Sequence, residues 1–190
     1  MPVNPLLSRI PHHSVVIDVD VLGFTAKRLS KAYPKEAGTF LTGYRRENIT
    51  HPHRDTNSFV VDSYYCPPSD ADTWSWTWAE EDFFRAKRWA AGLNREVIGM
   101  AHSHPWKHPH FTAVCQSQQD VGLQDRYGLP ISLIFNIWQD GWWVTAWKHN
   151  QAFPMKIILR TGDVHMTLFH WLRRYGSDLE PWMNAKSYPE

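Results

Sequence analysis

The sequence predicts an α/β or α+β sandwich in which helices flank a central mixed β-sheet. Three observations support this fold class. Segments with helical periodicity alternate with short, apolar, strand-like segments along the chain. With 190 residues and 43% hydrophobic content, the chain is large enough to bury one core. It shows no internal repeat, low-complexity tract or linker-like segment, so we expect a single domain over residues 1–190.

The first third of the chain predicts a strand, a helix and two further strands. Residues 14–17 are an apolar run typical of a short strand. Residues 21–32 carry apolar side chains at helical spacing, and Asp20 can cap that helix. Residues 39–44 and 57–65 favour two strands, joined by a polar loop rich in His, Arg and Asp.

The middle of the chain predicts two helices with a buried strand between them. Thr77 and Glu80 have the spacing of a capping box, which predicts a helix over 78–91 with Gly92 as its stop signal. Residues 96–104 are typical of a buried strand. Residues 117–124 then favour a short helix, in which positions 117 and 120 share one face.

The last third predicts a hairpin, a strand and a final helix. Residues 131–138 and 142–148 are strand-like, and the Asp140-Gly141 pair between them is typical of a tight turn. Residues 156–160 favour another strand, and residues 164–175 have helical character. This order of elements is the one expected for a helix and sheet sandwich.

Charge and hydropathy argue against nucleic acids and membranes as partners. The 20 basic and 19 acidic residues are well mixed and give a net charge of +1, so no basic face predicts nucleic-acid binding. The first residues lack the apolar core of a signal peptide, and no apolar run approaches the roughly 20 residues that span a bilayer. The chain has two cysteines, which fits a reducing compartment. We therefore expect a cytoplasmic protein.

A His-Ser-His sequence predicts a metal site at the end of the strand over 96–104. Because side chains alternate along a strand, His102 and His104 point to the same face. The carboxylate of Asp120, from the next element, completes a set of three ligands. Three protein ligands leave the fourth position of Zn²⁺ open for water, which indicates a hydrolytic rather than a structural site.

Glu36 is the candidate general base. It lies next to an apolar, strand-like run, where a bare carboxylate is costly unless it has a function. The alternative interpretation is an ordinary carboxylate at the edge of a strand.

Five positions resemble the JAMM motif of the JAB/MPN domain, a family of zinc-dependent isopeptidases that remove ubiquitin and ubiquitin-like proteins from their targets. The similarity consists of Pro-x-Glu-x-Gly at 34–38, His-Ser-His-Pro at 102–105 and Ser-x-x-Asp at 117–120. All of these in this order are a specific signal. The resemblance covers about residues 13–150, with a C-terminal strand and helix expected over 155–176, and it implies the MPN/JAB fold, which is similar to that of cytidine deaminases.

The resemblance also implies a role for each motif residue. One zinc ion would be held by His102, His104 and Asp120, with a water at the open position. Glu36 would take the proton of this water and deliver it to the departing amine. Ser117 would donate a hydrogen bond to the oxyanion of the tetrahedral intermediate. The substrate would be the bond after the C-terminal glycine of a ubiquitin-like protein, in a lysine isopeptide or a linear extension.

Several alternatives stay open at the level of biological role. Family members of this size resemble deconjugating enzymes of bacterial antiviral conjugation systems. A second enzymatic interpretation is the processing of sulfur-carrier proteins, which share the ubiquitin fold and tail. A third is a metal-free MPN scaffold that only binds a protein partner. The sequence leaves the oligomeric state, the modifier and its target open.

The spacing between the second histidine and the serine departs from the family pattern. Twelve residues separate His104 from Ser117, against about seven in the family. Asp125 is therefore a competing ligand, although no serine precedes it by three residues. A simpler interpretation of Ser117 and Asp120 is that they cap the helix and do nothing else.

The longer segment itself predicts substrate contacts. We expect Trp106, His108 and His110 to contact the extended tail of a ubiquitin-like protein, which adds as a strand in the family. Trp106 could instead pack over the loop. A second zinc ion bound by His108, His110 and Cys115 is the less favoured interpretation, because such clusters are more often simple loops.

Overall fold

The computed structural model describes residues 14–46, 58–67, 70–71, 76–108, 115–151, 154–162 and 164–167. Its helices are α1 (Val19–Ala32), α2 (Glu80–Gly92) and α3 (Gln118–Tyr127). Its strands are β1 (Ser14–Asp18), β2 (Gly38–Arg46), β3 (Ser58–Tyr65), β4 (Asp70–Ala71), β5 (Trp76–Thr77), β6 (Glu96–Pro105), β7 (Ile131–Trp138), β8 (Gly141–Lys148), β9 (Lys156–Thr161) and β10 (Val164–Thr167). None of the helices in these described ranges is long and apolar enough to cross a membrane.

Eight of the strands form one mixed sheet, in the order β10-β9-β1-β3-β2-β6-β7-β8. The pairs β1–β3, β1–β9 and β6–β7 are parallel, and the other pairs are antiparallel. Strands β4 and β5 form a separate two-stranded ladder. The predicted mixed sheet flanked by helices is therefore confirmed.

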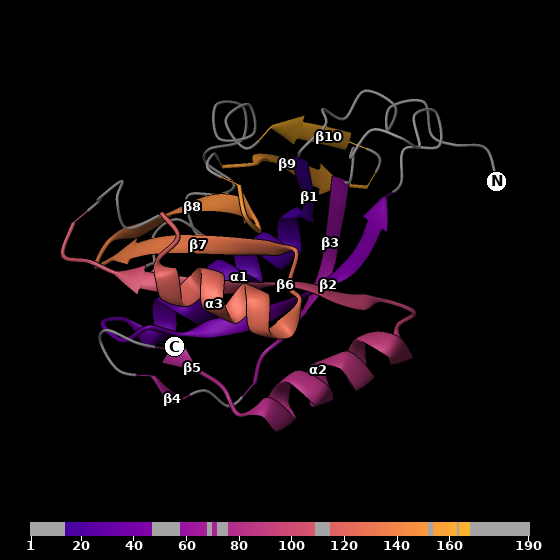
Figure 1. Ribbon diagram of the computed structural model, residues 1–190. Helices are drawn as coiled ribbons and strands as arrows, with labels where there is room; N and C mark the ends of the chain where they lie inside the picture. The colour runs from indigo at the N-terminus through magenta and orange to yellow at the C-terminus, as the bar shows by residue number, and fades with distance from the viewer. Residues whose placement is uncertain are drawn as a thin grey trace.

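The helices cover both faces of this sheet. Figure 1 shows α1 behind strands β6 and β7 and α3 in front of them. The buried side chains of α1 share one apolar cluster with Ala101 of β6, whereas those of α2 share another with Met100. Because side chains alternate along β6, His102 and His104 lie on the face of Met100, and Ser103 lies on the face of α1.

The start of α1 differs from the prediction. The helix begins at Val19, with Asp18 as its N-cap, and the predicted cap Asp20 lies inside its first turn. The carboxylate of Asp18 makes no capping bond, because it accepts hydrogen bonds from Nε and Nη2 of Arg160 in β9 instead. A long-range ion pair has thus replaced the local cap.

The predicted capping box of α2 is wrong. Residues Trp76 and Thr77 pair with β4 as strand β5, so the helix begins at Glu80 with Ala79 as its N-cap and no side-chain cap. The first turn instead carries three acidic residues, which the positive end of the helix dipole stabilises. The helix runs through Gly92, one residue past its predicted end, and Leu93 is its C-cap; the residue with a positive φ, of 55°, is Asn94 and not the predicted stop signal Gly92.

The predicted helix over 164–175 is also wrong where the structure describes it. Residues 164–167 form β10, antiparallel to β9, and residues 168–175 lie outside the described residues. Gly162 precedes β10 with a positive φ of 54°, which lets the chain reverse after β9. Pairing with a neighbouring strand has overridden the local helical preference of this segment.

Candidate metal centre

Strand β6, an interior strand of the sheet, carries the two histidines. It lies between β2 and β7, and its backbone bonds on both sides fix its position. His102 is buried and His104 is half-buried. Their Nε2 atoms lie 3.1 Å apart, because the two residues are two positions apart on one face of the strand.

Helix α3 brings the carboxylate to the same point. Asp120 is buried in the first turn of α3, and Ser117 caps that turn. The Asp120 N–H donates to Ser117 Oγ at 3.1 Å, and the Ser117 N–H donates to Asp120 Oδ2 at 2.7 Å. This reciprocal capping box, which the sequence analysis gave only as a simpler alternative role for the two residues, fixes the carboxylate to the backbone.

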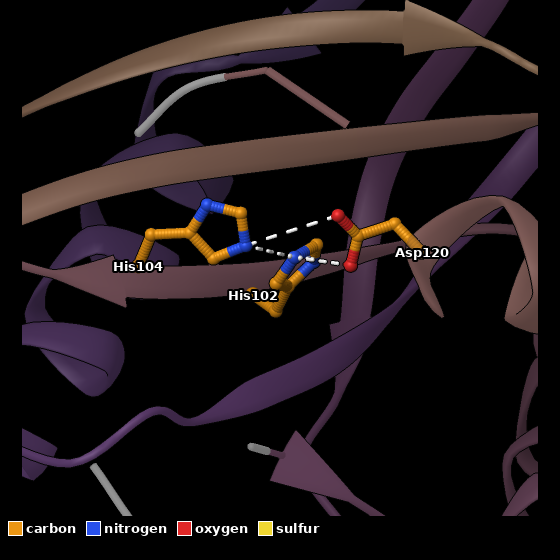
Figure 2. Close-up of side chains that lie close together, drawn as sticks. All are labelled: His102, His104 and Asp120. Atoms are coloured by element: carbon orange, nitrogen blue, oxygen red, sulfur yellow. Dashed lines mark hydrogen bonds and ion pairs between the residues drawn. The ribbon is translucent and has the colours of Figure 1, made fainter. Parts of the chain in front are cut away.

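The three side chains converge on one small volume. Figure 2 shows both imidazole rings and the carboxylate pointing toward one another. His102 Nε2 lies 2.9 Å from Asp120 Oδ1, and His104 Nε2 lies 3.8 Å from Asp120 Oδ2. A tetrahedral ion with bonds of about 2.0–2.1 Å requires ligand atoms about 3.3 Å apart. The spacing and the chemistry of these donors therefore fit a group that can hold a metal ion.

The charges within the site favour an ion pair when no metal is bound. Burial by itself would lower the pKa of His102, but the charge and hydrogen bond of Asp120 and the charge of Glu36 raise it above the ordinary value. Burial opposes ionisation of Asp120, yet the charge and hydrogen bond of His102 and the backbone N–H of Ser117 hold the pKa of this carboxyl well below its usual range. The site is thus built around a charged carboxylate.

Glu36 lies beside this group. It is half-buried in the segment between α1 and β2, and its charge acts on His102. The first residue of β2, Gly38, pairs with His102 in the sheet. The structure therefore places the predicted base near the same end of β6 as the predicted ligands.

The other predicted site residues lie at the start of α3 and after the end of β6. Ser117 is exposed, and because its Oγ accepts the capping bond, its hydroxyl hydrogen can still be donated. Trp106 is 39% exposed, and its backbone is held by Ile137 O and by the hydroxyl of Tyr33. His108 is exposed, and His110 lies outside the described residues.

The structure tests the competing ligand Asp125 but not the alternative second zinc site. Asp125 is exposed on α3, and its carboxylate lies 2.7 Å from Nε2 of His149, so it is held apart from the metal-binding group. Cys115 is exposed at the far end of the long segment. The set of His108, His110 and Cys115 stays the less favoured interpretation, and it is untested because His110 is outside the part of the chain that the structure describes.

The sequence analysis did not identify two residues that support the site. The buried amide of Asn136 in β7 donates to the backbone carbonyl of His104 at 3.3 Å. The buried hydroxyl of Ser103 accepts the N–H of Ala37, next to Glu36. In each case the available signal was a polar residue within an apolar strand, which must find a partner when it is buried.

Comparison with protein families agrees with this geometry. The sequence profile of the prokaryotic homologues of the JAB domain matches residues 19–149, which include the Glu, both His, the Ser and the Asp of the site. The chain belongs to this family. The family includes metal-dependent peptidases, and the prediction of a JAB/MPN domain is confirmed.

A solved structure shows the same fold as this JAB domain. A protein from Desulfitobacterium hafniense, determined in solution, superposes with a TM-score of 0.58 at 18% identity, over 80% of this chain and 99% of that protein. A JAB1/MPN domain protein from Archaeoglobus fulgidus gives a TM-score of 0.48 at 16% identity, over 76% and 98% of the two chains. The sequence matches none of the curated proteins with which it was compared.

Proposed function

We propose that this JAB domain is a zinc-dependent peptidase that hydrolyses the bond after the C-terminal glycine of a ubiquitin-like protein. The observation that carries the proposal is a largely buried group of two imidazoles and one carboxylate, with a second carboxylate, Glu36, beside it. A purely structural zinc site would use four protein ligands. Three ligands and an adjacent acid are instead the arrangement of a hydrolase.

The ligands and the metal have separate tasks in this proposal. His102, His104 and Asp120 would hold the ion, and Zn²⁺ when bound supplies Lewis acidity and lowers the pKa of a water. The capping box keeps Asp120 ionised and oriented, because its Oδ2 accepts the Ser117 N–H. A fixed carboxylate needs no rearrangement before it binds the ion.

Glu36 and Ser117 would act on the substrate. Glu36 accepts the proton of the attacking water and delivers it to the departing amine. The Ser117 hydroxyl, at the N-cap of α3, donates a hydrogen bond to the oxygen that becomes negatively charged. Its capping bond uses only the acceptor side of the hydroxyl. One side chain therefore serves the helix and the reaction at once.

Contacts to the tail of the ubiquitin-like protein complete the proposal. We assign them to Trp106 and His108, together with His110. The Trp106 side chain is exposed two positions after His104, while its backbone is fixed by two hydrogen bonds. An exposed, anchored aromatic side chain next to a metal group is suited to binding an extended peptide.

The test is a cleavage assay on the zinc-loaded protein. The substrates are linear fusions and lysine conjugates of ubiquitin-like modifiers, with sulfur-carrier precursors as a separate arm. We expect cleavage after the terminal glycine that a chelator abolishes and zinc restores, and that Glu36→Gln abolishes while metal content is unchanged. Cleavage of the sulfur-carrier arm alone would transfer the proposal to precursor processing. Stoichiometric zinc with no cleavage of any substrate would overturn the proposal in favour of a binding scaffold.

A further inference from the structure

We propose that Ser103, the residue between the two histidines, is a positioning residue for Glu36. Its hydroxyl holds the backbone at Ala37 and thereby fixes where the neighbouring carboxylate stands relative to His102 and His104. This inference deepens the proposed function and rests on it, because it takes Glu36 to be the base of that reaction.

The contacts between Ser103 and Ala37 form a closed set. The Ala37 N–H donates to Ser103 Oγ at 3.0 Å, and the Ser103 N–H donates to the Ala37 carbonyl at 2.9 Å. Ser103 Oγ is also 3.4 Å from the same carbonyl. Both residues are buried, at 1% and 3% exposure. A side chain and a backbone segment 66 residues apart are thus joined away from competing water.

The geometry of β6 separates this role from metal binding. Successive side chains of a strand point to opposite faces, so the Ser103 hydroxyl lies on the face of α1 while the two imidazoles lie on the other face. Ser103 therefore acts through the backbone of Ala37 and not through contact with an ion or a substrate.

The position of Ala37 explains why this bond matters for Glu36. The Ala37 N–H belongs to the peptide that joins Glu36 to Ala37, and β2 begins at the next residue, Gly38, where sheet pairing with His102 starts. Without the Ser103 hydroxyl, the Ala37 N–H is buried with its donor unsatisfied, and the segment must shift to satisfy it. Such a shift moves the Glu36 carboxylate, and a displacement of about 1 Å at a reacting group can cost a factor of 100 in rate.

The variants separate positioning from simple loss of stability. Ser103→Ala removes the hydroxyl, and Ser103→Thr retains it. Ser132→Ala is the matched control, because Ser132 is a buried serine in the adjacent strand β7 whose hydroxyl has no hydrogen-bond partner among the described residues. Glu36→Gln marks the behaviour expected when the carboxylate is lost.

Kinetics is the first readout. We expect Ser103→Ala to lower kcat by about 10- to 100-fold with KM and zinc content unchanged, Ser103→Thr to restore most of the rate, and Ser132→Ala to match the unaltered protein. An equal rate in Ser103→Ala and the unaltered protein overturns the inference. If the unaltered protein cleaves nothing, the proposed function fails, and the next readouts still decide the role of Ser103.

Two further readouts need no substrate. Amide hydrogen exchange measured by NMR should show the Ala37 N–H protected in the unaltered protein and in Ser132→Ala, and exchanging at least about 10-fold faster in Ser103→Ala. With Co²⁺ in place of zinc, the visible spectrum of Ser103→Ala should change with pH as that of Glu36→Gln does. Unchanged protection of Ala37, or a Co²⁺ spectrum identical to that of the unaltered protein, overturns the inference.

Discussion

Two helices of this domain follow the same sequence pattern, a hydroxyl residue with an acid three positions later, and only one of them uses it as a cap. In α3, Ser117 and Asp120 form both bonds of a capping box. In α2, Thr77 is not at the N-cap position, because the helix begins at Glu80 and its N-cap is Ala79, which makes no side-chain capping bond. The pattern therefore expresses a local preference for a helix start, and the surrounding structure decides whether the helix begins there.

The surroundings of the two patterns explain the difference. Just before α2, residues 76–77 pair as a strand, and the ring of Trp78 packs on Phe40 and Tyr127 at centroid distances of 4.8 and 5.2 Å. These contacts hold residues 76–78 outside the helix, so α2 begins only at Glu80. Ser117 is exposed and makes no such contact with the core, so the local bonds of the box can form.

The comparison also links fold and function. The acid of the unused pattern, Glu80, is exposed, whereas Asp120 is 5% exposed and faces two histidines. The α3 box therefore fixes the start of a helix and the direction of a candidate ligand at once. Changes to the two patterns should have very different consequences, from loss of metal binding at one extreme to a small loss of stability at the other.

The largest effect is expected from Asp120→Ala. It removes one of three donors and one half of the capping box, so the protein should lose stoichiometric zinc and all metal-dependent activity. Zinc should raise the Tm of the unaltered protein and not that of the variant, because only binding to the folded state stabilises it. Metal analysis and thermal unfolding measure both. Asp125→Ala, an exposed acid on the same helix, is the control and should keep its zinc.

The metal-free protein should show a pH response that depends on the same carboxylate. The raised pKa of His102 adds stability that is complete below about 6.5 and is lost as pH rises through the folded-state value. The lowered pKa of Asp120 adds stability that is present above about 3.8 and is lost as pH falls. Relative to Asp120→Asn, the metal-free protein should be most stable between these values. Denaturant unfolding across this range should show the difference shrinking on both sides; a constant difference contradicts the account.

A smaller loss is expected from Ser117→Ala. The variant removes the cap acceptor of the Asp120 N–H, which should lower the free energy of unfolding by about 1 kcal/mol. Since the box also orients the ligand, zinc affinity should fall about 10-fold. Chemical denaturation and competitive zinc titration measure the two effects. Ser117→Thr, which retains a capping oxygen, should recover both; recovery of neither would contradict the double role of the box.

The smallest effect is expected from Glu80→Gln at the unused pattern. Glu80 is exposed and caps nothing, so the change removes only its favourable charge at the start of α2. The free energy of unfolding should fall by about 0.3–0.5 kcal/mol, and zinc affinity should not change. A loss as large as that of Ser117→Ala would show that α2 is capped in solution after all.

Sequence patterns were sufficient to predict most of the elements and the group of His102, His104 and Asp120. The helical spacing of α1, the Asp-Gly turn between β7 and β8 and the His-Ser-His sequence on β6 each depend on neighbours in the chain. Asp120 was chosen over Asp125 because a serine precedes it by three positions, and the structure places Asp120, not Asp125, with the two histidines.

Features that depend on distant partners could not be predicted in this way. The carboxylate of Asp18, the N-cap residue of α1, binds Arg160, which is 142 residues away in the chain, and makes no capping bond. Residues 164–167 form a strand because they pair with the edge of β9. The supporting bonds of Asn136 and Ser103 likewise join different strands or segments, so the sequence shows the polar residue but not its partner.

The central claim is that two histidines of β6 and the capped aspartate of α3 together hold one divalent ion. The most direct measurement is anomalous X-ray diffraction at the zinc edge on crystals grown with Zn²⁺. The account predicts one peak at about 2.0–2.2 Å from Nε2 of His102, Nε2 of His104 and a carboxylate oxygen of Asp120. No peak at this position, or a zinc ion held there by other side chains, would contradict it.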